Sequence, residues 1–498
     1  QRIVVHGDYD CDGISGAVIL TGALRRLGAE VEPFVPDREK DGYGVSQRLV
    51  RHAGAKGVAL LITVDTASSA HEALELAKEL GIETIVCDHH LFTKRPVGAN
   101  WLINPQREDD DSENKGLCGT AVAWKLIRGV EMVLGRDADS GRELDLVALA
   151  LLADQMPLTG ENRALCRLGL ARMRRGERPG LVALEETARL SAALLDEQDV
   201  LYQLAPRINA AGRIASALRA VELLLAEDQG VARPLAAELD SLNRQRQKID
   251  FAVTEEAFEQ AEELIREKDA AGLVLASASW HMGVVGIAAS RVVERFHRPA
   301  VLLAISGDEA RGSGRATDGF HLKRALDACA EHLSRYGGHA AAAGMTLKRA
   351  HIPAFRRSFA ASVASMPHEA QRPPLRLDAR LRLSELDADL VHFLQRFGPY
   401  GPGHPEPLFG AFSLYRHDQK VFKEAHLKLQ LAEEGAGRSF IGFGLAPDFA
   451  HFVQKWPTVD VAFHVRYQPR GAYDPWQLRI RDLRAAQAKA PGKEEVSS

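Results

Sequence analysis

The stretch RIVVHGDYDCDG, at residues 2–13, decides how the rest of the chain is interpreted. Its apolar residues 3–5 predict a buried strand, and residues 14–27 predict a helix with an apolar face and two arginines in its last turn. The loop between them holds one histidine and three aspartates within seven residues. This acidic loop therefore follows the carboxyl end of a strand, where α/β sheets place their ligand sites.

Three carboxylates in one short loop repel one another, so a cation is expected to neutralise them. A divalent metal ion is the favoured candidate, with His6, Asp10 and Asp12 as ligands. Asp10 and Asp12 alternate along the backbone and can point the same way, and His6 lies at the strand tip. The alternative is a solvated turn, because Asp and Gly are common turn residues.

The composition indicates a soluble globular protein. The 498 residues suffice for roughly two to four domains, and 46% of them are hydrophobic and 26% charged. No apolar run reaches the roughly 18 residues of a transmembrane helix, and no signal-peptide pattern is present, so we expect no membrane segment and a cytoplasmic location. Because the chain starts directly on a core strand, we also expect that upstream residues are missing from it.

The cysteines and the net charge exclude few classes of function. The five cysteines are scattered without CxxC spacing, which favours free thiols in a reducing compartment over disulfides or a zinc site. The net charge of −4 gives no global basic signal. Binding to nucleic acid remains open, because a carboxylate-rich metal site can mask a local basic surface.

Apolar strands alternate with amphipathic helices over the first 100 residues. Strands are predicted at residues 3–5, 31–35, 60–64 and 84–87, with helices at 14–27, about 45–52, and from Ser68 or Ser69 as the cap to Leu80. This alternation predicts a parallel sheet that is covered on both faces.

Metal-type ligands follow three of these strands. They are His6, Asp10 and Asp12 after the first, Asp65 after the third, and Asp88, His89 and His90 after the fourth. Because the carboxyl ends of parallel strands lie on one edge of a sheet, these side chains should converge although they are far apart in the sequence.

Two further positions leave alternatives open. Gly116 to Gly119 precede an apolar helix, and such a helix start either binds a phosphate or makes a tight contact between helix and sheet. Asp154 ends a core-like apolar segment, 146–152, just before Pro157. It is either a cap for the next turn or a metal ligand that points inward.

The second half contains further candidates for phosphate binding. Residues 202–214 carry Arg207, Asn209 and Arg213 among small residues, and the alternative is an ordinary surface turn. Residues 240–268 predict one long polar helix. A second α/β unit follows, and its glycine-rich stretches include the segment 311–315, RGSGR, which offers backbone N–H groups, a hydroxyl and guanidinium groups as a phosphate cradle.

Residues 373–483 differ in character, with short alternating strands at 375–383, 427–431, 459–465 and 476–480. This pattern predicts a small β-barrel of the OB type, which binds single strands of nucleic acid by stacking and basic grooves. The aromatic residues that could stack on bases, or else form the core, are Phe397, Tyr400, Phe409, Phe422, Tyr473 and Trp476. The polar segment 485–498 is expected to be a disordered tail.

The motifs DYDCDG, VD, DHH and LLADQMPL, taken together, resemble those of the DHH phosphoesterase superfamily. The resemblance implies a site for two metal ions, Mn²⁺ or Mg²⁺, whose ligands are His6, Asp10, Asp12, Asp65, His89 and Asp154. One ion would be held mainly by His6, Asp10 and Asp65 and the other by Asp12, Asp65, His89 and Asp154, with Asp65 shared. Asp8, Asp88 and His90 would surround the ligands or handle protons. The catalytic set is then Asp10, Asp12, Asp65, Asp88, His89, His90 and Asp154.

The chain departs from the superfamily's pattern at two places. Ala67 replaces the usual glycine after the second acidic motif, and Gln155-Met156 replaces the usual apolar pair after Asp154. Neither change removes a ligand. Ala67 would matter if its position requires a positive φ.

WHMGVVG, GSGR and GGHAAAAG resemble the DHH-associated domain of the superfamily. This resemblance implies that Arg315 and His339 face the metal site and hold substrate phosphates. The full set of predicted substrate-binding residues is Arg207, Asn209, Arg213, His281, Ser313, Arg315, Gly337, Gly338 and His339. Near the C-terminus, PYGPGHPEPLF, HLKLQL and WQLRIRDL resemble the single-strand-specific 5′→3′ exonucleases within the superfamily.

The predicted organisation is a catalytic DHH domain at 1–235, a connecting helix at 236–268, a DHH-associated domain at 269–365, an OB domain at 373–484 and the tail. The ligand set of carboxylates and imidazoles without thiolate suits Mg²⁺ or Mn²⁺, and its histidines favour Mn²⁺. The implied activity is hydrolysis of single-stranded DNA to 5′-mononucleotides in recombination and repair. Single-strand binding protein and a helicase are the implied partners.

Two other functions remain open at this point. One is a DHH enzyme for small substrates, such as a pyrophosphatase, an oligoribonuclease or a cyclic-dinucleotide phosphodiesterase, although these typically lack the C-terminal barrel. The other is an inactive DHH scaffold in replication, which the presence of all six expected ligands disfavours.

Overall fold

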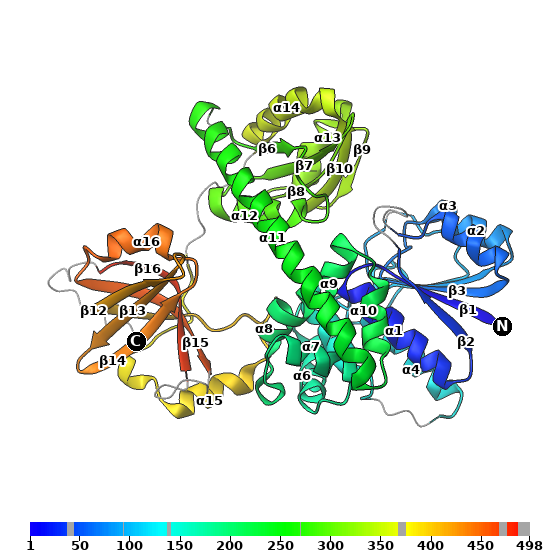
Figure 1. Ribbon diagram of the computed structural model, residues 1–498, viewed down its shortest axis with the longest axis horizontal. Coiled ribbons are helices and arrows are strands. Elements are labelled where there is room, and N and C mark those ends of the chain that lie inside the picture. Colours follow the sequence, from blue (N-terminus) through cyan, green and yellow to red (C-terminus); the bar gives the residue numbers. More distant parts are fainter. Residues whose placement is uncertain are drawn as a thin grey trace. The chain divides into compact units, whose positions relative to one another are not determined.

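The computed structural model describes residues 1–36, 44–92, 94–136, 141–268, 270–366, 375–467 and 476–486. It divides into two compact units (Figure 1). The first unit consists of residues 1–156 and 164–373, and the second of residues 157–163 and 374–498. No helix in the described part of the chain is long and apolar enough to span a membrane.

The first sheet is entirely parallel, with the strand order β2-β1-β3-β4-β5. Its strands are β1 (Arg2–Gly7), β2 (Glu30–Phe34), β3 (Val58–Val64), β4 (Glu83–Cys87) and β5 (Trp101–Ile103). Its neighbouring helices are α1 (Cys11–Arg26), α2 (Gln47–Ala55), α3 (His71–Glu79), α4 (Gly119–Val133) and α5 (Leu144–Ala153). Leu61 packs with residues of α2 and α3 on one face, and Val64 meets α1 on the other. The predicted parallel sheet with two covered faces is therefore confirmed.

The predicted serine cap of α3 is wrong. The N-cap residue is Ala70, and no side chain accepts a hydrogen bond from the start of the helix. Ser68 instead accepts a hydrogen bond from Asn104 Nδ2 at 2.9 Å, and its backbone N–H donates to Asp88 at 3.0 Å. The serine therefore ties the loop after β3 to the loop after β4.

Helices follow the sheet until the end of the long helix α11 (Gln229–Lys268). They are α6 (Gly160–Arg174), α7 (Pro179–Thr187), α8 (Glu197–Asp199), α9 (Ala205–Ile214) and α10 (Leu218–Leu225), with a 3₁₀ turn η1 (Ala192–Leu194) and a π turn η2 (Val200–Leu204). α11 starts before the predicted polar segment 240–268 because its first turns bury Ala232, Ala236 and Leu239 and contact α7. A polar pattern cannot reveal that part of the helix.

The second sheet is mixed, with the order β6-β7-β8-β10-β9, in which only β6 and β7 are parallel to each other. Its strands are β6 (Leu273–Ser277), β7 (Ala300–Ser306), β8 (Glu309–Arg315), β9 (Arg335–Gly338) and β10 (Ala342–Lys348). Its helices are α12 (Val285–Phe296), α13 (Leu322–Asp327) and α14 (Ile352–Ser365), with short 3₁₀ turns η3 (Ala330–His332) and η4 (Arg349–His351).

The segment RGSGR lies in strand β8, so the predicted loop with available N–H groups is wrong. β8 pairs with β7 on one side and β10 on the other, which engages its backbone in the sheet. A Cβ at Gly312 would lie 2.2 Å from Leu302 O, and one at Gly314 would lie 2.9 Å from Leu322 Cδ2. These glycines permit close packing rather than a turn. The alternating residues Ser313 and Arg315 point to the opposite face.

The second unit is a closed barrel, as predicted, with the order β11-β12-β13-β14-β16-β15 and closure between β12 and β15. Its strands are β11 (Ala379–Arg380), β12 (Phe409–Phe422), β13 (His426–Glu433), β14 (Ala436–Gly442), β15 (Thr458–Tyr467) and β16 (Trp476–Ala485). Helices α15 (Ala388–Phe397) and α16 (Ala446–Val453) and a 3₁₀ turn η5 (Leu383–Glu385) complete it. The strand predicted at 375–383 is reduced to the two residues of β11.

Candidate metal centre and substrate-binding residues

The carboxyl ends of β1, β3 and β4 bring the predicted ligands together. His89 Nε2 lies 3.1 Å from Asp65 Oδ1, 3.7 Å from Asp12 Oδ2 and 3.6 Å from Asp154 Oδ2. Asp12 lies in the first turn of α1, Asp65 and His89 lie in the loops after β3 and β4, and Asp154 caps the end of α5. Their convergence is the result that the parallel topology predicts.

Asp12 is held by the start of α4. The backbone N–H groups of Gly119 and Thr120 donate to its two carboxylate oxygens, each at 2.7 Å. A Cβ at Gly119 would lie 2.7 Å from Asp65 Cβ, so only glycine fits there. The helix start around Gly119 thus binds a carboxylate of the protein itself and orients it toward the site.

Asp10 and Asp154 occupy opposite helix ends. Asp10 is the N-cap of α1, and its Oδ1 accepts hydrogen bonds from Asp12 N at 3.0 Å and Gly13 N at 3.3 Å. Asp154 is the C-cap residue of α5, and its carboxylate points to His89. Asp154 therefore lies in the cluster.

The Asp88–His90 pair lies beside the cluster. Asp88 Oδ1 accepts hydrogen bonds from His89 N at 2.8 Å and His90 N at 3.2 Å and lies 2.8 Å from His90 Nδ1. Burial alone would raise the pKa of Asp88, but its hydrogen bonds with His90 and Ser68 lower it. The bond to Asp88 raises the pKa of His90 to about 9. Asp88 thus fixes the loop that carries both histidines.

Three groups of side chains place ligand atoms within 4.8 Å of one another in the described part of the chain. They are Asp65 with His89 and His90, Asp12 with His89 and Asp154, and Asp8 with Asp10 and Asp65. Asp65 and His89 each belong to two of them, as expected for a shared site. His6 belongs to none of the three groups. It is buried at the end of β1, with its ring 5.5 Å from that of Phe34.

The electrostatics of the cluster favour a bound cation. Burial raises the pKa of Asp65 well above its usual value, and Asp12, Asp10, Asp8 and Asp88 raise it further. Burial and then Asp12 also raise the pKa of Asp10, and burial with the neighbouring aspartates raises that of Asp154 to about 8. Carboxylates that repel one another in this way, with imidazole nitrogens beside them, fit a hard divalent ion such as Mg²⁺ or Mn²⁺.

Three residues at the site have positive φ angles: Asp65 (61°), Ala67 (86°) and Gln155 (53°). The two departures from the superfamily's pattern thus fall on strained backbone positions. Ala67 stands where glycine would be free of strain, and such strain costs about 1–3 kcal/mol.

Helix α9 packs directly on the acidic loop. Asn209 Oδ1 accepts a hydrogen bond from Cys11 N at 2.7 Å, and a Cβ at Gly212 would lie 2.1 Å from Tyr9 O. Arg213 Nη1 donates to Gly283 O at 3.0 Å, which links this helix to the second sheet's domain. Arg207 forms an ion pair with Asp240 at 3.0 Å. A substrate contact of these residues stays a prediction.

The remaining predicted substrate residues surround the start of α12 and the edge of the second sheet. Arg315 and Ser313 approach Gly286, where a Cβ would lie 3.1 Å from Arg315 Nη2 and 3.3 Å from Ser313 Oγ. His281 Nδ1 accepts a hydrogen bond from Gly283 N at 3.0 Å. Gly337 and Gly338 end the edge strand β9, Gly338 has a φ of 144°, and exposed His339 follows. The role of this second group in substrate binding is also untested.

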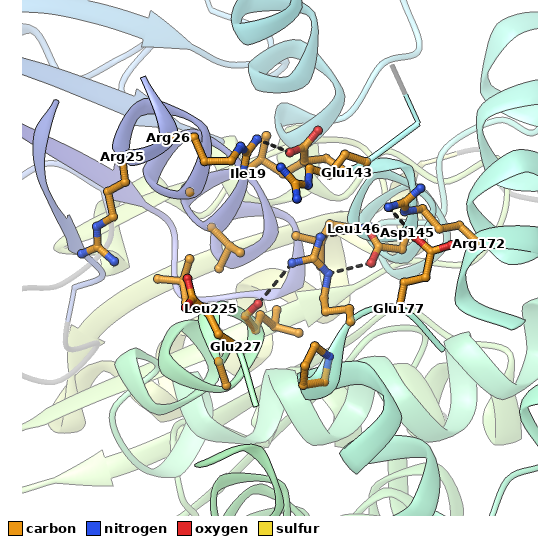
Figure 2. A pocket seen from close by; sticks show the side chains of 17 residues that line it. Ile19, Arg25, Arg26, Glu143, Asp145, Leu146, Arg172, Glu177, Leu225 and Glu227 are labelled. Atoms are coloured by element: carbon orange, nitrogen blue, oxygen red, sulfur yellow. Dashed lines mark hydrogen bonds and ion pairs between the residues drawn. The ribbon is translucent and has the colours of Figure 1, made fainter. Parts of the chain in front are cut away.

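A cavity of about 610 Å³ lies beside the C-terminal half of α1 and the N-terminal end of α5, the helix ends away from Asp12 and Asp154 (Figure 2). Three of the acids that line it are paired with arginines. Arg178 binds Asp145 through two bonds of 2.6 and 3.1 Å, Arg26 binds Glu143, and Arg172 lies 2.6 Å from Glu177. This cavity was not anticipated from the sequence, because its residues carry no motif.

The aromatic candidates of the barrel differ in exposure. Phe409 is buried against Phe463, whereas Phe397 is 43% exposed and lies beside Phe393. Trp476 packs against the barrel core. Tyr473 lies outside the described residues.

Comparisons with known proteins agree with this architecture. Residues 2–151 match the model of the DHH family, N-terminal domain, residues 269–365 match the DHHA1 domain, and residues 377–482 match the RecJ OB domain. The fold and the acidic cluster thus define a member of the DHH class of proteins.

Sequence relatives identify the family within the DHH class to which this chain belongs. The chain is 39% identical to "Single-stranded-DNA-specific exonuclease RecJ" of Dickeya dadantii, over 93% of this chain and 83% of that protein. It is 38% identical to the protein of the same name from Escherichia coli, with coverages of 92% and 82%. The chain belongs to the RecJ family. Among solved structures, Thermus thermophilus RecJ in complex with Mn²⁺ matches with a TM-score of 0.81 and 32% identity, covering 98% of this chain and 69% of that one.

Proposed function

We propose that this chain hydrolyses single-stranded DNA from the 5′ end and releases 5′-mononucleotides, with two Mn²⁺ or Mg²⁺ ions as cofactors. The observation that carries the proposal is the convergence of Asp12, Asp65, His89 and Asp154 at one sheet edge. The relatives are named for this activity, and solved RecJ structures contain Mn²⁺ or Mg²⁺.

The residues assigned to the ions are those predicted from the sequence, His6, Asp10, Asp12, Asp65, His89 and Asp154. Asp65 would be the shared ligand, and this is supported by its place in two of the ligand groups, one with Asp8 and Asp10 and one with His89 and His90. Two bound ions supply an activated water and stabilise negative charge at phosphorus. Asp88 orients His90, and Gly119 N–H orients Asp12. Arg315, Ser313 and His339 are assigned to the 5′ end of the strand.

The test uses single-stranded DNA labelled at either end, with Mn²⁺, with Mg²⁺ and with a chelator. The proposal requires mononucleotides to be released from the free 5′ end only, and the chelator to abolish release. Asp65→Asn should reduce the release by about 10³-fold. Asp109→Asn is the matched control, because Asp109 is an exposed acid in an ion pair with Arg107 and should leave the rate unchanged.

The two alternatives predict different products. Binding of DNA without cleavage under any metal condition would favour a scaffold in replication. Cleavage of dinucleotides or cyclic dinucleotides alone would favour a small-substrate phosphodiesterase. We favour the exonuclease because the chain carries the RecJ OB domain that such small-substrate enzymes typically lack.

We further propose the domain division predicted from the sequence, a cytoplasmic location, and single-strand binding protein with a helicase as partners. The location is supported by the DNA substrate of the relatives and by free, buried thiols at all five cysteines. Pull-down of the full chain from a lysate, with and without nuclease treatment, tests whether either partner binds directly.

A further inference from the structure

Four arginines surround the first half of α12, and one buried carboxylate faces them. Arg213 binds the loop just before the helix, and Arg315 lies against its first turn. Arg291 belongs to the helix itself, and Arg246 extends from the adjacent α11. We call these four residues the α12 arginine cluster.

The carboxylate is Asp250 in α11, which is 1% exposed. Its Oδ2 lies 3.0 Å from Arg291 Nη2 and 3.4 Å from Arg246 Nη1. Arg246 also donates to Asn243 Oδ1 at 2.6 Å. Residues 243, 246 and 250 share one face of α11, so a single helix face organises the two guanidinium groups.

The charges of this region do not balance. Arg291, Arg246 and Arg213 all act on Asp250 electrostatically, yet burial still raises its pKa. Arg315 is half-buried, and in the described part of the chain no carboxylate pairs with it. Arg246, Arg291 and Arg315 are thus three partly buried cations beside one carboxylate, Asp250, and such a group is costly unless an anion completes it.

The cluster adjoins the metal centre. Arg213, at the end of α9, donates to Gly283 O just before α12 at 3.0 Å. Its helix α9 also contacts the acidic loop through Asn209 and Gly212. A strand whose terminal phosphodiester reaches the metal centre would therefore bring its next phosphates to these arginines.

We infer that Asp250 is a positioning residue that, together with the buried Arg246 beside it, holds Arg291 where Arg291 binds a backbone phosphate of the substrate strand. This inference rests on the proposed function and concerns how the strand is held, not how it is cut. Arg291 is 44% exposed at its side chain, and among the described residues Asp250 is its one carboxylate partner, so the side chain would turn to solvent without Asp250. Arg246 would be left as a buried charge without a carboxylate.

The test is Asp250→Asn in the full chain, measured by binding of labelled single-stranded DNA in chelator, where no cleavage occurs. We expect the Kd to rise about tenfold and the dependence of log Kd on log salt to become shallower, because phosphate contacts are lost. Simple removal of a negative charge predicts the opposite, tighter binding. Tighter or unchanged binding by a folded Asp250→Asn protein would overturn the inference.

Two further variants separate positioning from damage to the fold. Arg291→Met should raise the Kd to a similar extent, and the double variant should add little, because both changes remove the same contact. Glu238→Gln on the same helix α11 is the control, since Glu238 pairs with Arg219 at the surface.

In turnover with Mn²⁺, Asp250→Asn should raise KM and leave kcat within about twofold, whereas misfolding would lower kcat alone. If the unaltered chain binds or cuts no DNA, the proposed function fails instead.

Discussion

Carboxylates lie at both ends of the packed helices α1 and α5, but the charges around them differ. At one end, buried Asp12 and the more exposed Asp154 face other acids and His89. At the other end, around the cavity of Figure 2, the buried Asp145 and Glu143 each have an arginine. Both ends are acidic, and only one of them has its charges balanced within the protein.

This contrast separates stability from function. A carboxylate with its own arginine is satisfied within the protein, and removal of either partner is costly. Carboxylates that face one another lower the stability of the metal-free chain and become favourable when a divalent ion binds. The same Asp→Asn substitution should therefore have opposite effects at the two ends.

The largest effect is expected at the acidic end. Asp65→Asn should reduce exonuclease activity by about 10³-fold, the upper range for removal of one electrostatic group from an active site. It should also weaken Mn²⁺ binding in calorimetric titration. The free energy of unfolding in chelator should not fall, because like-charge repulsion is relieved. A clear loss of stability in chelator would contradict the expected relief of repulsion among the aspartates.

At the balanced end, Asp145→Asn should destabilise the protein by about 3–5 kcal/mol, because Arg178 is left without its buried carboxylate. Urea unfolding at neutral pH measures this change. Glu186→Gln, which breaks the exposed pair with Arg233, should leave the urea midpoint unchanged. Equal midpoints for all three proteins would show that the pair at Asp145 contributes nothing.

Glu185 provides a third case, a buried carboxylate that forms no ion pair with any described arginine and lies outside the acidic cluster. It is 3% exposed, and burial, with a smaller effect of Asp199, raises its pKa from 4.5 to about 7. The folded state therefore binds a proton more tightly than the unfolded state, so stability should fall as pH rises from 4.5 to about 7 and then level off. Glu185→Gln should be more stable than the parent by about 2–3 kcal/mol at pH 8 and equal to it below pH 4.5. Urea unfolding of both proteins over this pH range measures the difference in stability. A difference that does not change with pH would refute the assignment.

The smallest effect concerns backbone strain at the acidic end. Ala67→Gly should stabilise the protein by about 1 kcal/mol, because Ala67 has a φ of 86° that glycine adopts freely. Ala73→Gly within α3 is the control and should destabilise by about 1 kcal/mol, the cost of glycine in a helix. Chemical denaturation of both variants should therefore shift in opposite directions.

The parts predicted well from the sequence are those with a strong local signal. Apolar strands that end in Asp or His predict the sheet and the convergence of Asp12, Asp65 and His89, because parallel topology alone brings strand ends together. The same reasoning left Asp154 undecided, since a single acid after a helix has no periodic pattern to place it.

Contacts between distant segments were not predictable in this way. The N–H groups that hold Asp12 come from residues 107 and 108 positions later. Arg207 resembled a free phosphate ligand, but Asp240, 33 residues away, pairs with it. Gly312 and Gly314 were predicted to offer backbone N–H groups to a phosphate, whereas in β8 these glycines permit close packing of neighbouring residues.

The continuous helix α11 limits which changes the chain can tolerate during evolution. Asp240 pairs with Arg207 of α9 at one level, and ten residues later Asp250 pairs with Arg291 of α12 at the next. An insertion of one residue between them would rotate everything beyond it by about 100° and shift it by about 1.5 Å. No insertion would return Asp250 to both its present direction around the helix and its present distance from Asp240. We therefore expect this segment to diverge by substitution, with its length unchanged.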